Sequence, residues 1–154
     1  MIRDDRQIAD IVEIENIIKS SVSCRLGLSD DGQPYVVPMS FGYDPEQSAI
    51  YFHSAREGRK VETIRKNPRV CVEFDIDLEL VEAKVACGFT MKYRSVIAFG
   101  KASIIDDPDG KIAGYDILMR QYSDAESFEY KPRNLADSVI IKVDIESMTG
   151  KRSV

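Results

Sequence analysis

Hydrophobic residues recur at helical spacing in the first part of the chain. From residue 7 to residue 20, isoleucines fall three or four positions apart, which predicts an amphipathic helix. A second, shorter helix is predicted over residues 58–67, because its hydrophobic residues share one face and Pro68 disfavours helix at the residue before it. A third helix is predicted after Asp107-Pro108, where an N-cap residue precedes a proline suited to the first helical position.

Alternation of hydrophobic and polar residues predicts strands in most of the remaining chain. The clearest case is residues 69–77, where valine, phenylalanine and isoleucine alternate with cysteine and acidic residues. The turn sequence Asp30-Asp31-Gly32 favours a hairpin. Pro38 interrupts the next run and indicates an edge, a bulge or a place where another group approaches the backbone, because proline has no ladder donor. The predicted strands are 24–29, 35–43, 49–54, 69–77, 95–105 and 138–145, and the polar segment 123–137 is predicted to be a loop.

These elements predict a mainly β, antiparallel, barrel-like sheet. Six or seven strands with mostly hairpin connections, and two or three peripheral helices, do not form the pattern of a doubly wound sheet. The chain has no glycine-rich strand-to-helix turn of the dinucleotide-binding type. Its length of 154 residues predicts a single domain spanning residues 1–154.

Composition narrows the classes of function. A net charge of −5 and a pI near 5.0 argue against nucleic-acid binding and against a polybasic membrane binder. No apolar run approaches the ~18 residues of a membrane span, and the N-terminus lacks the apolar region of a signal peptide, so we expect a cytoplasmic protein. Cys24, Cys71 and Cys87 are widely spaced and odd in number, which predicts neither a disulfide framework nor a zinc site, and we assign none of them a catalytic role.

The segment from residue 51 to residue 74 carries the most chemistry. A predicted strand ends in His53-Ser54, and Gly58-Arg59-Lys60 begins the next helix. Backbone donors at a helix N-terminus favour an anion, and an arginine and a lysine there add charge-assisted hydrogen bonds, so the segment is a candidate phosphate site. The alternative is an ordinary solvated basic helix that balances the acidic surface. His53 is the only histidine, which excludes a multi-histidine metal centre within one chain.

The same segment resembles a known family. The blocks YFHSA, GRK and NPRVCVEFD, in this order, are similar to the central motif of the pyridoxamine 5'-phosphate oxidase-like, FMN-binding split-barrel superfamily, and more closely to its nitroimidazole-reductase-like branch. Three further blocks agree in the same order: CRLGLSDDGQPYVVPMSFGY, ACGFTMKYRSVIAFGKASIIDDP and VIIKVDIESMTGKR. The resemblance covers nearly the whole chain and implies a six- to seven-stranded antiparallel split β-barrel.

The resemblance also implies a cofactor site. The strip beside the flavin ring would be Pro38, Met39, Ser40 and Phe41, and the ribityl phosphate would lie at His53, Ser54, Ala55, Arg59 and Lys60. In the oxidases an Arg-Gln pair reaches the flavin, often from the other subunit; Arg94-Ser95 stands in its place here, with serine instead of glutamine. Thr90 and Tyr93 are nearby candidates for polar contacts, with loop and core packing as the alternative.

The function implied is that of an FMN-dependent oxidoreductase. FAD is also possible, NAD(P)H would be the reductant, a small nitroaromatic or quinone-like molecule the acceptor, and nitroimidazole reduction the sharper form of the prediction. The protein would be a homodimer with the flavin at the subunit interface. His53 is predicted to be catalytic, because a histidine beside the flavin can transfer a proton to a substrate.

Other interpretations remain. True pyridoxamine phosphate oxidases end in a segment with a tryptophan and a substrate-binding arginine, whereas this chain has no tryptophan and ends in MTGKRSV, so we expect no pyridoxamine phosphate oxidation. The chain could instead bind flavin without turnover, as a carrier, sensor or storage module. A third alternative keeps the barrel but exchanges the ligand for a deazaflavin or for haem, which His53 could ligate.

Overall fold

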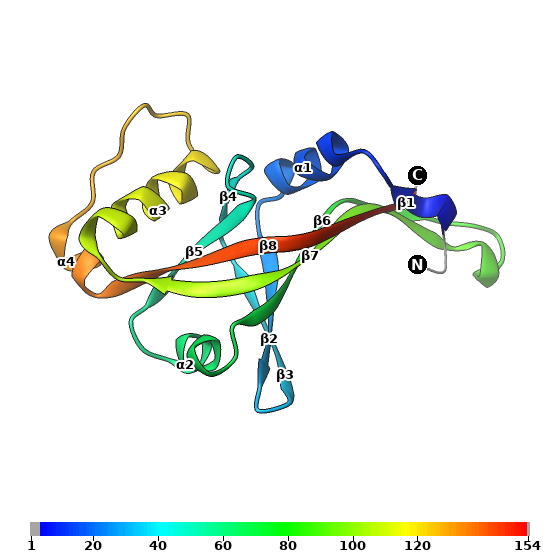
Figure 1. The fold of residues 1–154 in the computed structure, drawn as a ribbon. Coiled ribbons are helices and arrows are strands. Elements are labelled where there is room, and N and C mark those ends of the chain that lie inside the picture. Colours follow the sequence, from blue (N-terminus) through cyan, green and yellow to red (C-terminus); the bar gives the residue numbers. More distant parts are fainter. Residues whose placement is uncertain (1–3, 154) are drawn as a thin grey trace.

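The computed structural model describes residues 4–153 and contains one antiparallel sheet of eight strands (Figure 1). The predicted mainly β, barrel-like architecture is therefore confirmed. The strands follow the spatial order β3-β2-β6-β7-β8-β5-β4, and β1 pairs with the other end of β8. Their bounds are β1 Gln7–Ile8, β2 Cys24–Asp30, β3 Gln33–Met39, β4 Gly42–Asp44, β5 Ala49–Ala55, β6 Arg69–Val81, β7 Thr90–Ile105 and β8 Ser138–Ser153.

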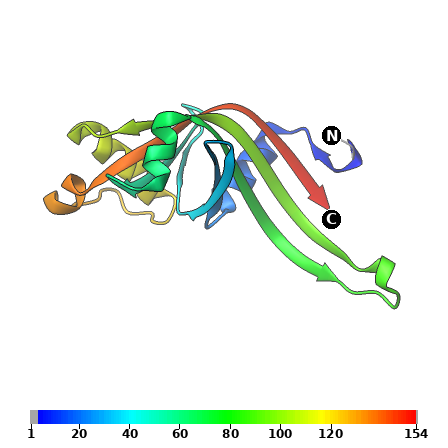
Figure 2. The same ribbon diagram turned by 90° about the horizontal axis from the view of Figure 1, so that it is seen from below.

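The sheet is strongly curved, and its three longest strands continue well beyond the curved part (Figure 2). We call residues 75–95 and 146–153, the far ends of β6, β7 and β8, the arm. β7 and β8 change register between Phe99 and Gly100, where the sheet bends. A Cβ atom at Gly100 would lie 2.2 Å from the carbonyl oxygen of Asp144, so only glycine permits this close approach of the strands.

The hydrophobic core lies on the concave side of the curved sheet. Alternate residues of β6 point into it, with Val72 and Phe74 fully buried, as the period-2 pattern predicts. Phe74 packs edge-on against Phe41, with ring centroids 4.9 Å apart. The other fully buried large side chains are Phe52, Ile17, Ile18, Leu26, Ile50, Ile140, Ile141, Val61 and Val96.

Three helices cover the sheet and a fourth closes one end. α1 (Ile11–Ser20) packs on β6 and β7, whereas α2 (Arg59–Lys66) and α3 (Pro108–Arg120) lie on opposite sides of the β7-β8-β5 strands (Figure 1). α3 begins as predicted, because the Asp107 carboxylate accepts a hydrogen bond from the Gly110 N–H at 2.8 Å. The short α4 (Pro132–Ala136) precedes β8. No helix among residues 4–153 is long and apolar enough to cross a membrane.

Several boundaries differ from the prediction. The predicted strand 35–43 is not one strand, because strand structure is interrupted at Ser40 and Phe41, between β3 and β4. The helix predicted from residue 7 begins at Ile11, since Gln7 and Ile8 pair with β8. The strands of the arm are longer than predicted, because backbone hydrogen bonds extend them where both faces are exposed and no alternation marks them. The predicted loop 123–137 contains α4.

Candidate functional site

β5 distributes the predicted site residues over two faces of the sheet. Ile50 and Phe52 belong to the main core, so the alternation of side chains places Ser54 on the same face. Tyr51 packs with Leu118 of α3, and His53 follows on that opposite face. His53 and Ser54 therefore do not point together at one ligand group. Ser54 is buried, and Ala55 is exposed at the end of the strand.

His53 opens into two adjoining cavities on the α3 side of β5. The inner cavity, of about 250 Å³, is lined by Ser40, His53, Tyr115, Leu118, Met119 and Tyr122. The outer cavity, of about 440 Å³, shares His53 and Tyr115 and is otherwise lined by Glu129, Tyr130, Lys131, Asn134 and Leu135. The rings of His53, Tyr115 and Tyr130 follow one another, with centroids 6.0 Å and then 5.3 Å apart.

The imidazole of His53 is free to engage a ligand. Within residues 4–153 its ring contacts Tyr115 but makes no hydrogen bond. Partial burial, and then the positive charge of Lys60, lower the pKa of His53 below its ordinary value of 6.5. The ring is therefore neutral at pH 7, with one nitrogen able to donate and the other able to accept a hydrogen bond.

Lys60 has no carboxylate partner among residues 4–153. Its Nζ donates a hydrogen bond to the Met39 sulfur, at 3.4 Å. Burial lowers the pKa of Lys60 below its ordinary value. The N-terminus of α2 has no side-chain cap, and Gly58 precedes it with φ +132° and open space where a Cβ would be. Gly58, Lys60 and the first backbone N–H groups of α2, which we call the anion cradle, fit a phosphate group.

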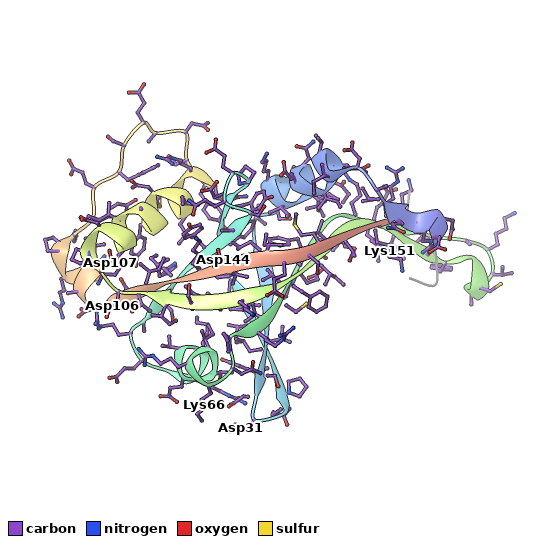
Figure 3. The ribbon with its side chains drawn as sticks, in the orientation of Figure 1. Asp31, Lys66, Asp106, Asp107, Asp144 and Lys151 are labelled. Carbon is purple, nitrogen blue, oxygen red and sulfur yellow. The ribbon has the colours of Figure 1, made fainter. Side chains whose placement is uncertain are left out.

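Arg59 points elsewhere. Its Nε donates to Asp30 at 2.9 Å, and its guanidinium lies 4.3 Å from the ring centroid of Tyr35. Two turns further along α2, Lys66 lies 3.7 Å from Asp31, and Figure 3 shows Asp31 at the tip of the β2–β3 hairpin with Lys66 beside it. Arg59 and Lys66 thus fasten the hairpin to α2. The Nε of Arg59 is thus occupied by Asp30, while its other N–H groups make no hydrogen bond among residues 4–153.

The strip from Pro38 to Phe41 is only partly open. Pro38 is exposed on β3, an edge strand that pairs with β2 alone in the described chain, and Met39 is buried beside Lys60. Ser40 lines the inner cavity. Phe41 is fully buried, and its N–H donates to the Tyr122 hydroxyl at 3.1 Å. The side chain of Phe41 therefore supports the strip from beneath, within the core.

The remaining predicted residues lie on the arm. Arg94 donates to Asp77 at 2.6 Å, and Tyr93 and Arg94 line a cavity of about 100 Å³. Ser95 pairs with Asp75, and Thr90 is exposed at the start of β7. Ser138 of β8 pairs with the end of β5, whereas Ser153 of β8 pairs with Tyr93. The stretch of β8 between these two pairs is roughly 50 Å long, and it separates the arm residues from the end of β5. Within one chain they do not join the other predicted site residues.

The three tyrosines around His53 were missed as site residues. The helical spacing after Asp107-Pro108 predicts that Tyr115 and Tyr122 face the core, although Tyr122 lies just beyond the end of α3, and Tyr130 lies in a polar segment. The structure places their rings at the two cavities. The aromatic residues Phe128 and Tyr130 in a polar segment were the available signal for Tyr130.

The cysteines and acidic groups indicate no further site. Burial raises the pKa of Cys24 to about 12, so its thiol stays protonated. Cys71 is half-buried, and Cys87 is exposed. Among the described residues, no cluster of three or more histidine, cysteine, aspartate or glutamate side chains could hold a metal ion.

Comparison with known families agrees with this architecture. The family model described as pyridoxamine 5'-phosphate oxidase matches residues 10–152. The chain belongs to the pyridoxamine 5'-phosphate oxidase family. The resemblance that the four sequence blocks indicated is confirmed, and with it the split-barrel fold.

Several solved structures are similar to this chain. A candidate 5-nitroimidazole antibiotic resistance protein from Bacteroides thetaiotaomicron is 36% identical, with a TM-score of 0.83; the match covers 95% of this chain and 86% of that one. An FAD-binding protein from Mesorhizobium loti is 25% identical, with a TM-score of 0.69 and coverage of 97% and 98%. An FAD- and haem-binding protein from Mycobacterium smegmatis shares the fold, with 18% identity, a TM-score of 0.85 and coverage of 96% and 73%. No curated protein matches the chain.

Proposed function

We propose that this chain binds FMN and acts as a flavin-dependent oxidoreductase, with NAD(P)H as electron donor and a small aromatic molecule as acceptor. The observation that carries the proposal is Lys60, a half-buried ammonium without a carboxylate partner among residues 4–153, beside the uncapped start of α2. A phosphate is the group that satisfies both features. Membership of the pyridoxamine 5'-phosphate oxidase family and the likeness to the Bacteroides protein support it.

The protein's own residues bind and orient in this proposal. Lys60 and the α2 backbone hold the phosphate, the Pro38–Ser40 strip borders the flavin ring, and His53 presents a neutral imidazole to a reacting molecule. The flavin, when bound, supplies the hydride or electron transfer. The phosphate site serves FMN or FAD equally, and FMN is proposed as the smaller ligand. The tail, which lacks a tryptophan, gives no reason to propose pyridoxamine phosphate as substrate.

A homodimer is part of the proposal. On the outer face of the sheet, Val36, Gly27, Cys71 and Phe99 are successive neighbours across β3, β2, β6 and β7. Val36 is 61% exposed and Phe99 is 53% exposed, and together with Gly27 and Cys71 they line a cavity of about 410 Å³. An exposed apolar row of this kind is typical of a subunit interface. A second copy packed there would bring a partner arm, with Arg94, toward the cofactor.

The test is reconstitution followed by titration. The absorption spectrum, recorded after addition of FMN and desalting, is expected to retain flavin bands. Lys60→Ala should weaken FMN binding by about 10- to 150-fold, because a charge-assisted hydrogen bond contributes about 1.5–3 kcal/mol. Arg59→Ala is the matched control on the same helix and should change the affinity little, since Arg59 is engaged by Asp30.

The outcomes separate the alternatives. Loss of flavin after desalting contradicts the proposal. An equal loss of affinity in Arg59→Ala and Lys60→Ala shows that Arg59 leaves Asp30 when the ligand binds. FMN binding without NAD(P)H oxidation, across a panel of acceptors, would indicate a flavin carrier or sensor rather than an oxidoreductase.

Haem is the second candidate ligand, and His53 is the observation that favours it. Its imidazole makes no hydrogen bond within the described residues and borders a cavity of about 440 Å³. A Soret band after addition of haemin, lost in His53→Ala and kept in Lys60→Ala, would indicate that the ligand is haem rather than FMN.

A further inference from the structure

The inner cavity is distinct from the anion cradle but adjoins it. Ser40 belongs both to the strip proposed to border the flavin ring and to the wall of the cavity. The charge of Lys60 also influences His53 across β5, so the two sites are within electrostatic reach. The cradle and the cavity lie on opposite sides of the β7-β8-β5 strands, so a molecule in the inner cavity would lie across Ser40 from a flavin ring that borders the Pro38–Ser40 strip; this placement rests on the proposed function.

The wall of the inner cavity is apolar and aromatic. Leu118, Met119 and the Tyr115 ring supply most of it, and none of the described residues that line it carries a charge other than a protonated His53. The pKa of His53 lies below 6.5, so this residue is also neutral at pH 7. A charged ligand would lose hydration here without gaining an ionic partner. The cavity therefore selects against charge.

The hydrogen-bonding groups that face the cavity are few. The Tyr122 hydroxyl donates to the Val22 carbonyl at 2.9 Å and accepts from the Phe41 N–H, and the Tyr115 hydroxyl donates to Ser138 at 2.8 Å. Both hydroxyls are thus engaged by the protein. The imidazole nitrogens of His53 and the hydroxyl of Ser40 make no side-chain hydrogen bond within residues 4–153, and they remain for a ligand.

The aromatic wall is held in place before any ligand arrives. Ser138, which accepts from Tyr115, donates in turn to the Asn134 carbonyl at 2.6 Å. Tyr130 donates to Asp116 at 2.6 Å, and its ring packs on Tyr115 with an interplanar angle of 36°. A rigid ring presented in this way binds another flat ring with little loss of side-chain freedom.

We propose that the inner cavity is a subsite for a flat, uncharged aromatic molecule, which stacks on Tyr115 and accepts a hydrogen bond from His53 or Ser40. The apolar wall determines the preference for a neutral molecule. The Tyr115 ring determines the preference for a flat one. The outer cavity, where Glu129 and Lys131 carry opposite charges, is its route to solvent.

Binding is tested with a matched pair of probes, 4-nitrobenzyl alcohol and 4-nitrobenzoate, which differ chiefly in charge. The C2 proton of the single histidine is an unambiguous NMR reporter. We expect 4-nitrobenzyl alcohol to shift this signal in a saturable way and 4-nitrobenzoate to bind at least ten times more weakly at pH 7.5. Equal or tighter binding of the benzoate, or no shift by the alcohol, overturns the inference.

Variants locate the binding. Tyr115→Leu should weaken the binding of 4-nitrobenzyl alcohol at least tenfold. Two controls should not weaken it: Tyr115→Phe, which keeps the ring, and Phe89→Leu, which removes an exposed ring on the arm. Met119→Lys places a cation in the wall and should reverse the preference toward 4-nitrobenzoate; it supplies the test if Tyr115→Leu does not fold. An unchanged preference in Met119→Lys places the probe outside this cavity and contradicts the inference.

The titration is run on the chain both without flavin and after addition of FMN. Failure of the chain to retain FMN contradicts the proposed function. The subsite is then tested by the probe titration of the chain without flavin. Retention of FMN without binding of either probe contradicts the subsite alone.

Discussion

We call the rest of the sheet outside the arm, with the helices packed on it, the barrel end. The barrel end and the arm use similar residues in opposite ways. At the barrel end, hydrophobic side chains such as Phe41, Phe52 and Phe74 are fully buried, while Lys60 and His53 lack an ionic partner among the described residues and Lys60 donates a hydrogen bond to the Met39 sulfur. On the arm, charges are paired, as in Arg94 with Asp77, and hydrophobic side chains are exposed. Leu78, Leu80, Phe89 and Met91 are each more than 40% exposed.

The difference shows that the two regions contribute differently to the stability of the fold and to binding. The barrel end supplies its own core and keeps polar groups available for a ligand. The arm satisfies its backbone and pairs several of its charges but leaves apolar surface without cover, which is typical of a surface that another chain covers. The four predictions below test this contrast, from the largest expected effect to the smallest.

The largest contrast concerns the free energy of unfolding. Phe41→Ala should lower it by about 3–5 kcal/mol, because the substitution leaves a cavity against Phe74. Phe89→Ala, on the arm, should change it by less than about 0.5 kcal/mol, since the ring is exposed. Urea denaturation at one protein concentration measures both. Similar losses for the two variants would show that the arm is part of the folding core.

The second contrast concerns the polar network that fastens α4. Lys111 is 5% exposed and donates to Asp106 and to the carbonyl oxygens of Leu135 and Ser138. Asp106 stands at the start of α3 (Figure 3) and also accepts from Arg56. Lys111→Met should destabilise the protein by about 1–3 kcal/mol, because buried acceptors lose their donor. Lys101→Met, at an exposed lysine 3.7 Å from Glu146, is the control and should have almost no effect on the melting temperature.

The third contrast asks whether the arm completes the cofactor site of a partner. Arg94→Ala and Lys60→Ala should each lower FMN affinity. If each site combines Lys60 of one subunit with Arg94 of the other, a refolded equal mixture of the two variants should regain about a quarter of the wild-type sites. With both single variants weakened, no recovery in the mixture would place both residues at the site of one chain, whereas an unchanged affinity in Arg94→Ala alone would remove Arg94 from the site. Fluorescence titration of the mixture measures the number of sites.

The smallest effect concerns the protonation of His53. Its pKa should lie below 6.5 and rise toward that value in Lys60→Met, because the positive charge of Lys60 contributes to lowering it. Lys66→Met, on the same helix but next to Asp31, should leave the pKa unchanged. Between the folded pKa and 6.5 the unfolded chain binds more protons, so His53 reduces stability as the pH falls through this range. An NMR titration of the C2 proton reports the pKa, and a value above 6.5 would contradict the prediction.

Local patterns predicted much of the fold but only part of the candidate site. The alternation in β6 and the N-cap at Asp107 were visible because each depends on neighbours along the chain. The separation of Ser54 from His53 also follows from strand geometry, although the motif suggested one cluster. The engagement of Arg59 by Asp30 could not be predicted, because these residues are 29 positions apart and meet only when the β2–β3 hairpin packs on α2.

The sequence by itself determined the family, the antiparallel barrel and the basic start of α2, because these depend on ordered motifs and on residue period. Only the tertiary structure decided that Arg59 is paired with Asp30 whereas Lys60 has no carboxylate partner among residues 4–153, that Tyr115, Tyr122 and Tyr130 surround His53, and that Arg94 lies on the arm. The physical reason is that the partners of a side chain depend on how distant strands and helices pack. Residue type and spacing indicate which groups a chain carries, and packing decides which of them remain free.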